Sequence, residues 1–143
     1  MKHTERESTV LMHSQERNVH GKIFGGYLMR QAFEMGWLTA ALFQKKQTLL
    51  LRVDQVLFLK PVDVGSIVKF KSKVTYSQKF NEKILMRVVT QTFLEDGSQA
   101  NNFNFLFLVK NSSEFNLIKP ETYDEILDYH EATRRLKFEP INL

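Results

Sequence analysis

The 143-residue chain contains no cysteine, three prolines and six glycines. Without cysteine it can form no disulfide, no thiolate nucleophile and no cysteine-based zinc site. So little proline and glycine excludes collagen-like and low-complexity structure. The apolar runs are short or interrupted by polar residues, and no secretory signal is recognisable, so we expect no membrane insertion.

The residues that are present fit one packed domain over residues 1–143, because 43% are hydrophobic and 25% are charged. Twenty Lys and Arg against sixteen Asp and Glu give a net charge of +4. Five of the acids fall in residues 121–131, so the rest of the chain is more basic than the total suggests. A basic body favours an anionic partner, but does not choose among nucleic acid, membrane and phosphorylated small molecule.

The spacing of apolar residues predicts a short strand at 9–12 and a helix from Gly25 to about residue 43. Several strands are predicted after the helix, and the last of them contains Phe103, Phe105 and Phe107. The helix is apolar on nearly every side, which is typical of a buried helix. We therefore expect an α+β fold in which an antiparallel sheet wraps around one long buried helix.

The sequence also predicts which residues of one strand face the core and where a C-terminal helix begins. Residues 68–76 alternate apolar side chains, ending with Val74 and Tyr76, with lysines on the outer face. Thr122 and Glu125 form a capping box for a C-terminal acidic helix. We expect that helix to pack through three apolar side chains, namely Tyr123, Ile126 and Leu127.

Several standard catalytic motifs are missing. The sequence has no nucleophile elbow, no Walker loop and no dinucleotide-binding glycine fingerprint, and its four histidines lack metal-ligand spacing. We therefore predict neither a metal centre nor a covalent serine mechanism. What remains is the segment that leads into the long helix, residues 18–26. Gly25 and Gly26 can let a ligand approach free backbone amides there, or can simply allow tight packing between helix and sheet.

Four segments carry a resemblance to a known family, namely residues 18–37, 53–62, 64–66 and 120–123. They resemble the hot-dog acyl-CoA thioesterases, and the greatest resemblance is to the second hot-dog domain of the two-domain acyl-CoA thioesterase 9 type. The resemblance covers most of the chain. It implies the hot-dog fold, hydrolysis of acyl-CoA to free fatty acid and CoA, and an intracellular protein, mitochondrial or cytosolic. It also implies that the chain is one half of a longer protein.

The resemblance implies a site shared between two hot-dog units. Gly25 and Gly26 would polarise the thioester carbonyl through their amides, and Asn18 would orient water or substrate. A carboxylate would act as general base or nucleophile. The position that bears this acid in many relatives is Phe33 here, so the acid would come from the partner unit or from neighbouring Glu34.

Other roles remain open for these residues. Glu34 can equally form a surface ion pair with Arg30, four residues earlier on the helix. Lys22, Lys60 and Arg87 can form a basic rim for the CoA phosphates, or can belong to solvated surfaces. CoA is part of the substrate, and no separate cofactor is expected.

Two wider alternatives follow from the missing acid. The chain can be half of an enzyme whose second hot-dog unit comes from a homodimer, a higher oligomer or the same polypeptide. It can instead be a non-catalytic module that binds acyl-CoA or mediates dimerisation. Nucleic-acid binding is not expected, because phenylalanines at strict period two are typical of a strand's core face.

Overall fold

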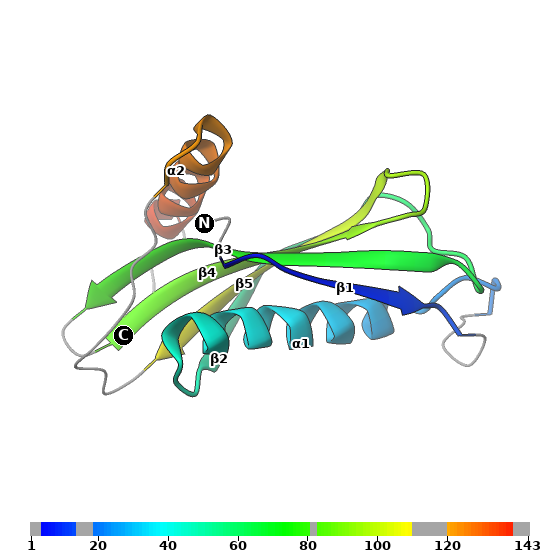
Figure 1. Cartoon of the computed structure of the whole chain (residues 1–143), viewed down its shortest axis with the longest axis horizontal. Helices are drawn as coiled ribbons and strands as arrows, with labels where there is room; N and C mark the ends of the chain where they lie inside the picture. Colours follow the sequence, from blue (N-terminus) through cyan, green and yellow to red (C-terminus); the bar gives the residue numbers. More distant parts are fainter. Residues whose placement is uncertain (1–3, 14–18, 81–82, 110–119, 139–143) are drawn as a thin grey trace.

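In the computed structural model the described residues form one antiparallel sheet and two helices, and the sheet lies between the helices (Figure 1). The structure describes residues 4–13, 19–80, 83–109 and 120–138. The elements in chain order are β1 (Arg6–Leu11), α1 (Gly25–Gln44), β2 (Leu49–Phe58), β3 (Ile67–Phe80), β4 (Lys83–Phe93), β5 (Gln99–Val109) and α2 (Tyr123–Phe138). The strand order is β1-β3-β4-β5-β2, so β1 and β2 are the two edges.

Helix α1 lies along one face of the sheet and packs through a stripe of small and apolar residues. Leu28, Ala32, Gly36 and Ala40 are buried at intervals of four residues, which places them on one side of the helix. Gly36 permits a close approach to β5, because an added Cβ would lie 3.2 Å from the ring of Phe105. The predicted helix is thereby confirmed over nearly its full length.

No described element of the chain covers the opposite side of α1. Leu38 and Leu42 are 43% and 46% exposed, although both are large and apolar. The expectation that α1 is buried on all sides is therefore wrong for the single chain, because one sheet covers only one side of a helix.

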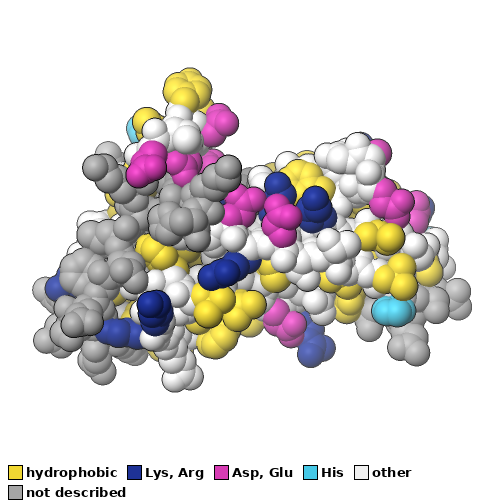
Figure 2. All heavy atoms as spheres, in the orientation of Figure 1, with side chains coloured by type: hydrophobic (Ala, Val, Ile, Leu, Met, Phe, Trp, Pro, Cys, Tyr) yellow, Lys and Arg dark blue, Asp and Glu magenta, His cyan; other side chains and the backbone are white. Residues whose placement is uncertain are grey.

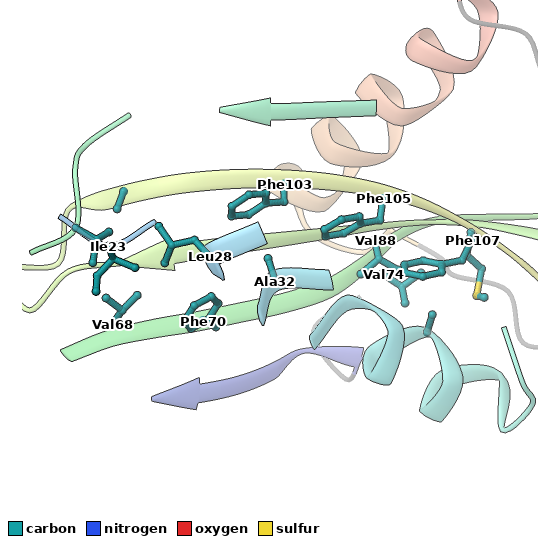
Figure 3. Close-up of a cluster of buried hydrophobic side chains, with 14 of the residues drawn as sticks. Ile23, Leu28, Ala32, Val68, Phe70, Val74, Val88, Phe103, Phe105 and Phe107 are labelled. Carbon is teal, nitrogen blue, oxygen red and sulfur yellow. The ribbon is translucent and has the colours of Figure 1, made fainter. Parts of the chain in front are cut away.

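The core between α1 and the sheet is built from aromatic side chains. Phe103, Phe105 and Phe107 are fully buried, and they lie on one face of β5 (Figure 3). Phe33 of α1 packs against two of them, with ring centroids 6.0 Å from Phe105 and 6.1 Å from Phe107. The prediction that these three phenylalanines form a core face is confirmed.

Strand β3 departs from simple alternation at one point. The register between β3 and β4 shifts between Val74 and Tyr76, as expected of a β-bulge. Val74 stays in the core on the α1 side, whereas the ring of Tyr76 lies 5.0 Å from that of Tyr129 in α2. The prediction that Tyr76 shares a face with Val74 is wrong, because the extra residue in the bulge reverses its direction.

Helix α2 packs on the other face of the sheet by a side that the sequence did not predict. Ala132 is buried, and Asp128 forms an ion pair with Lys73 of β3 at 2.9 Å. The three residues expected to pack are instead 49–75% exposed, namely Tyr123, Ile126 and Leu127. Acidic and apolar side chains thus share the outer surface of α2 (Figure 2).

The predicted capping box at the start of α2 is confirmed. The N–H of Glu125 donates to the Thr122 hydroxyl at 3.2 Å, and the N–H of Thr122 donates back to the Glu125 carboxylate at 3.1 Å. Burial opposes ionisation of Glu125, but the backbone N–H groups of Thr122 and Glu121 stabilise the carboxylate, and its pKa is lowered to about 2.

This capping box predicts an acid-sensitive contribution to stability. Because the folded pKa of Glu125 lies below its ordinary 4.5, the contribution is present above about pH 4.5 and is lost as pH falls toward 2. Its size should be about 1 kcal/mol, as for other helix caps. Urea unfolding at pH 7 and pH 3 measures it. The wild type should lose more stability than Glu125→Gln between these two pH values, and equal losses would contradict the assignment.

Among the described residues, no helix is long and apolar enough to cross a membrane. Nor do these residues bring together three His, Asp or Glu side chains that could hold a metal ion.

Candidate active site

The start of α1 presents backbone N–H groups that donate to no side-chain cap. Phe24 is the N-cap residue, with extended backbone angles (φ −65°, ψ 129°), and its side chain cannot cap the helix. The N–H groups of Tyr27 and Leu28 donate to the carbonyl of Phe24, at 3.1 and 3.3 Å. Within the described ranges, the N–H groups of Gly25 and Gly26 find no acceptor. Two donors and the positive end of the helix dipole therefore remain available to a ligand.

A pocket of about 340 Å³ lies beside these amides. Gly25 and Leu28 form one wall, the end of β2 and its following loop form another, and Asn101 of β5 completes the lining. The N–H of Ile23 donates to the carbonyl of Val62 at 2.8 Å and so ties the start of α1 to that loop. The lining combines apolar side chains with three basic ones, His20, Lys22 and Lys60.

The two glycines also allow close packing of aromatic rings. A Cβ on Gly25 would lie 3.3 Å from the ring of Phe58, and one on Gly26 would lie 2.8 Å from the ring of Phe24. Both rings are more than half exposed, so they can move away from a small substituent. The packing role and the ligand-binding role of these glycines are therefore compatible.

The structure brings some of the predicted site residues together. Gly25, Lys22 and Lys60 line the same pocket, with Gly26 next in the chain. Lys22 also forms an ion pair with Asp63 across the loop. Asn18 lies outside the described residues. The prediction for Asn18 thus stays a prediction.

Glu34 lies away from this pocket. It is eight residues beyond Gly26, which is about 12 Å along the helix axis at 1.5 Å per residue. Its carboxylate pairs with Arg30 Nε at 3.3 Å, and both side chains are more than half exposed. No carboxylate occurs among the described residues that line the pocket. The acid required by the thioesterase prediction is therefore not in place within the described part of the chain.

Arg87 is a correction to the predicted basic rim. Its side chain is 2% exposed and forms an ion pair with Asp54, whose side chain is fully buried. It pairs with Leu106 in the sheet, whereas its neighbour Val88 pairs with the core residue Phe105, so Arg87 faces the α2 side. It therefore does not lie at the start of α1. The sequence suggested a surface cation because Arg87 lies in an alternating strand. Nothing near it in the sequence reveals its partner, Asp54, which is 33 residues away.

Sequence reasoning missed Asn101. This residue is fully buried in β5, and the hydroxyl of Thr92 donates to its Oδ1 at 2.8 Å. Its Nδ2 is buried and has no hydrogen-bond partner among the described residues. A signal was available, because three asparagines occur within residues 101–104 and asparagine is uncommon in strands.

The known proteins to which this chain is similar in sequence are acyl-coenzyme A thioesterases. No protein-family model matches the chain. It is 38% identical over 140 residues to mouse acyl-coenzyme A thioesterase 10, mitochondrial, covering 96% of this chain and 31% of that protein. It is 36% identical over 137 residues to human acyl-coenzyme A thioesterase 9, mitochondrial, covering 94% of this chain and 30% of that protein. The chain thus spans less than a third of the length of these relatives.

Solved structures support the fold. An acyl-CoA hydrolase from Staphylococcus aureus, solved with butyryl-CoA, CoA and CoA disulfide, superposes with a TM-score of 0.86 at 24% identity, covering 97% of this chain and 85% of that one. A hexameric acyl-CoA thioesterase without ligand gives a TM-score of 0.78 at 20% identity, covering 99% and 96%. The predicted α+β hot-dog fold is confirmed.

Proposed function

Because this chain is a hot-dog domain homologous to acyl-CoA thioesterases 9 and 10, we propose that it takes part in hydrolysing acyl-CoA to free fatty acid and CoA. The observation that carries the proposal is the start of α1. There, a glycine pair offers amide donors beside a pocket with apolar and basic lining. The apolar part suits an acyl or pantetheine chain, and the lysines suit the phosphates of CoA.

The amides of Gly25 and Gly26 would act on the thioester carbonyl. Negative charge develops on this oxygen when water adds to the carbonyl carbon, and fixed donors at a helix start stabilise it. A carboxylate takes a proton from the attacking water as the water oxygen bonds to the carbonyl carbon. The C–S bond then breaks, and the protonated carboxylate returns the proton to the departing sulfur, so that CoA leaves as the thiol. Asn18 would help to orient the water or the substrate.

The carboxylate is the component that the pocket lacks. Phe33 packs in the core, and Glu34 is turned toward Arg30 on the exposed side of α1. We propose that a second hot-dog unit supplies the acid. The same observation favours a second candidate function, a module that binds acyl-CoA or mediates dimerisation without turnover.

A second unit also has a surface to bind. Strand β2 is a sheet edge that pairs only with β5 among the described strands. It carries three exposed leucines, Leu49, Leu50 and Leu51, and lies next to α1, since the indole N–H of Trp37 donates to the carbonyl of Thr48 at 3.1 Å. An unpaired edge beside the exposed Leu38 and Leu42 favours association. The partner would be a second copy, a higher oligomer or another domain of the same polypeptide.

The compartment is part of the same proposal. Relatives that match most of this chain are named mitochondrial thioesterases, and we infer an intracellular location, mitochondrial or cytosolic. Fractionation of cells that express the full-length protein measures it.

One assay separates the sources of the acid. The chain alone should bind a non-hydrolysable acyl-CoA in calorimetry but turn over acyl-CoA slowly, and Glu34→Gln should leave both properties unchanged. The stability of Glu34→Gln should also be close to wild type, since exposed i,i+4 pairs contribute little.

Each other outcome has a distinct meaning. Fast turnover by the chain alone that is lost in Glu34→Gln would assign the acid to Glu34. Fast turnover that survives this substitution would contradict both proposed sources. If a hot-dog unit carrying an aspartate at the position of Phe33 is added and turnover stays slow, the module is the better description.

A further inference from the structure

The buried side-chain amide of Asn101 is an unexplained polar group beside the start of α1. Asn101 lines the pocket that Gly25 also lines, and it is fully buried. In the sheet it is opposite Thr92 on one side and Phe58 on the other. Buried polar atoms in native proteins are nearly always hydrogen-bonded, yet in the described part of the chain its Nδ2 has no partner.

The hydrogen bond between this side chain and Thr92 shows which end of the amide lacks a partner among the described residues. Thr92 Oγ1 donates to Asn101 Oδ1 at 2.8 Å, so the carbonyl end of the amide is occupied. Nδ2 can only donate. The missing partner is therefore a hydrogen-bond acceptor, and a carbonyl oxygen is the acceptor that an apolar-walled pocket can admit without burying a charge.

We propose that Asn101 Nδ2 donates a hydrogen bond to a carbonyl oxygen of bound acyl-CoA, in the same pocket as the Gly25 amide. This inference rests on the proposed function and adds a substrate-contacting residue from β5, with Thr92 as the positioning residue for its amide. Two sources within acyl-CoA offer the required chemistry: the thioester carbonyl and the amide carbonyls of the pantetheine arm. The two lysines on the lining, Lys22 and Lys60, suit the phosphates at the far end of that arm.

The test compares two leucine substitutions on adjacent residues. Asn101→Leu removes the amide and keeps the number and branching of the side chain's heavy atoms. Asn102→Leu is the matched control, because Asn102 lines a separate pocket on the α2 side of the sheet. Calorimetry on the full chain measures the dissociation constants of a 2-oxoalkyl-CoA, which keeps a ketone carbonyl but cannot be hydrolysed, and of free CoA.

Asn101→Leu should bind the ketone analogue about tenfold more weakly, the usual worth of one hydrogen bond at a buried site. Its unfolding temperature should change little, because the substitution removes an unsatisfied donor but also removes the acceptor of the buried Thr92 hydroxyl. Asn102→Leu should bind as the wild type does. A loss confined to the ketone analogue assigns the contact to the thioester carbonyl, whereas an equal loss with free CoA assigns it to a pantetheine amide.

Thr92→Val provides a second variant should Asn101→Leu fail to fold. It retains the amide but removes its orienting hydroxyl, and affinity should fall about threefold. Wild-type affinity in the variant that folds overturns the role of Asn101 and leaves the proposed function intact. If the wild-type chain itself binds neither probe, the proposed function fails, and this inference fails with it.

Discussion

Replacing Gly25 with proline should reduce the proposed acyl-CoA hydrolysis by about 100- to 1000-fold without unfolding the domain. Gly25 is the first residue of α1, and proline is favoured at that position because the N–H it lacks has no partner in the helix. Phe24 already has the extended backbone that a residue before proline requires. The substitution therefore removes one amide donor, and losing such a donor typically costs this factor in turnover.

Gly25→Ala is the matched control. It keeps the N–H and adds only a Cβ, 3.3 Å from the movable ring of Phe58, so its activity should stay within a few-fold of wild type. Steady-state hydrolysis and thermal unfolding should be measured for both variants in the assembly that turns over. Equal activity of the alanine and proline variants would show that the Gly25 amide takes no part in the reaction.

Replacing Asp54 with leucine should lower the free energy of unfolding by about 3–5 kcal/mol, or roughly 10–17 °C in Tm. The Asp54 carboxylate is fully buried and forms ion pairs with Arg87 and Arg52. Without it, the guanidinium of Arg87 would stay buried without its countercharge. Removing one member of a buried pair is far more costly than the net value of the pair, because of this stranded charge.

The double variant Asp54→Leu/Arg87→Met separates the two effects. It leaves no uncompensated charge at position 87, and Arg52 is 28% exposed and can turn toward solvent. Most of the lost stability should return. As a surface control, Glu131→Gln breaks an exposed pair with Arg134 and should change stability little. If the double variant is as unstable as Asp54→Leu, the stranded charge is not the cause.

The elements that could be predicted from sequence are those specified by local pattern. Gly25 marks the start of α1, and period-two apolar spacing marks Phe103, Phe105 and Phe107 as one core face. The capping box marks the start of α2 through Thr122. Each signal depends on residues within a few positions of one another, so no knowledge of tertiary contacts is needed.

The features that could not be predicted depend on contacts between distant residues. The bulge before Tyr76 reverses the direction of its side chain, and alternation alone gives no warning of a bulge. The sheet face that α2 covers decides that Ala132 packs and Ile126 does not. Likewise, the buried state of Arg87 depends on Asp54 in another strand. In the site, the glycines could be found from sequence, whereas the unpartnered amide of Asn101 required the structure.

Binding of acyl-CoA with its carbonyl at the start of α1 can be observed by backbone amide NMR of the chain during titration with a 2-oxoalkyl-CoA. The amide protons of Gly25 and Gly26 should shift downfield as they gain an acceptor, while resonances of α2 stay in place. Saturable binding that leaves both glycine amides unmoved and shifts resonances elsewhere would contradict it.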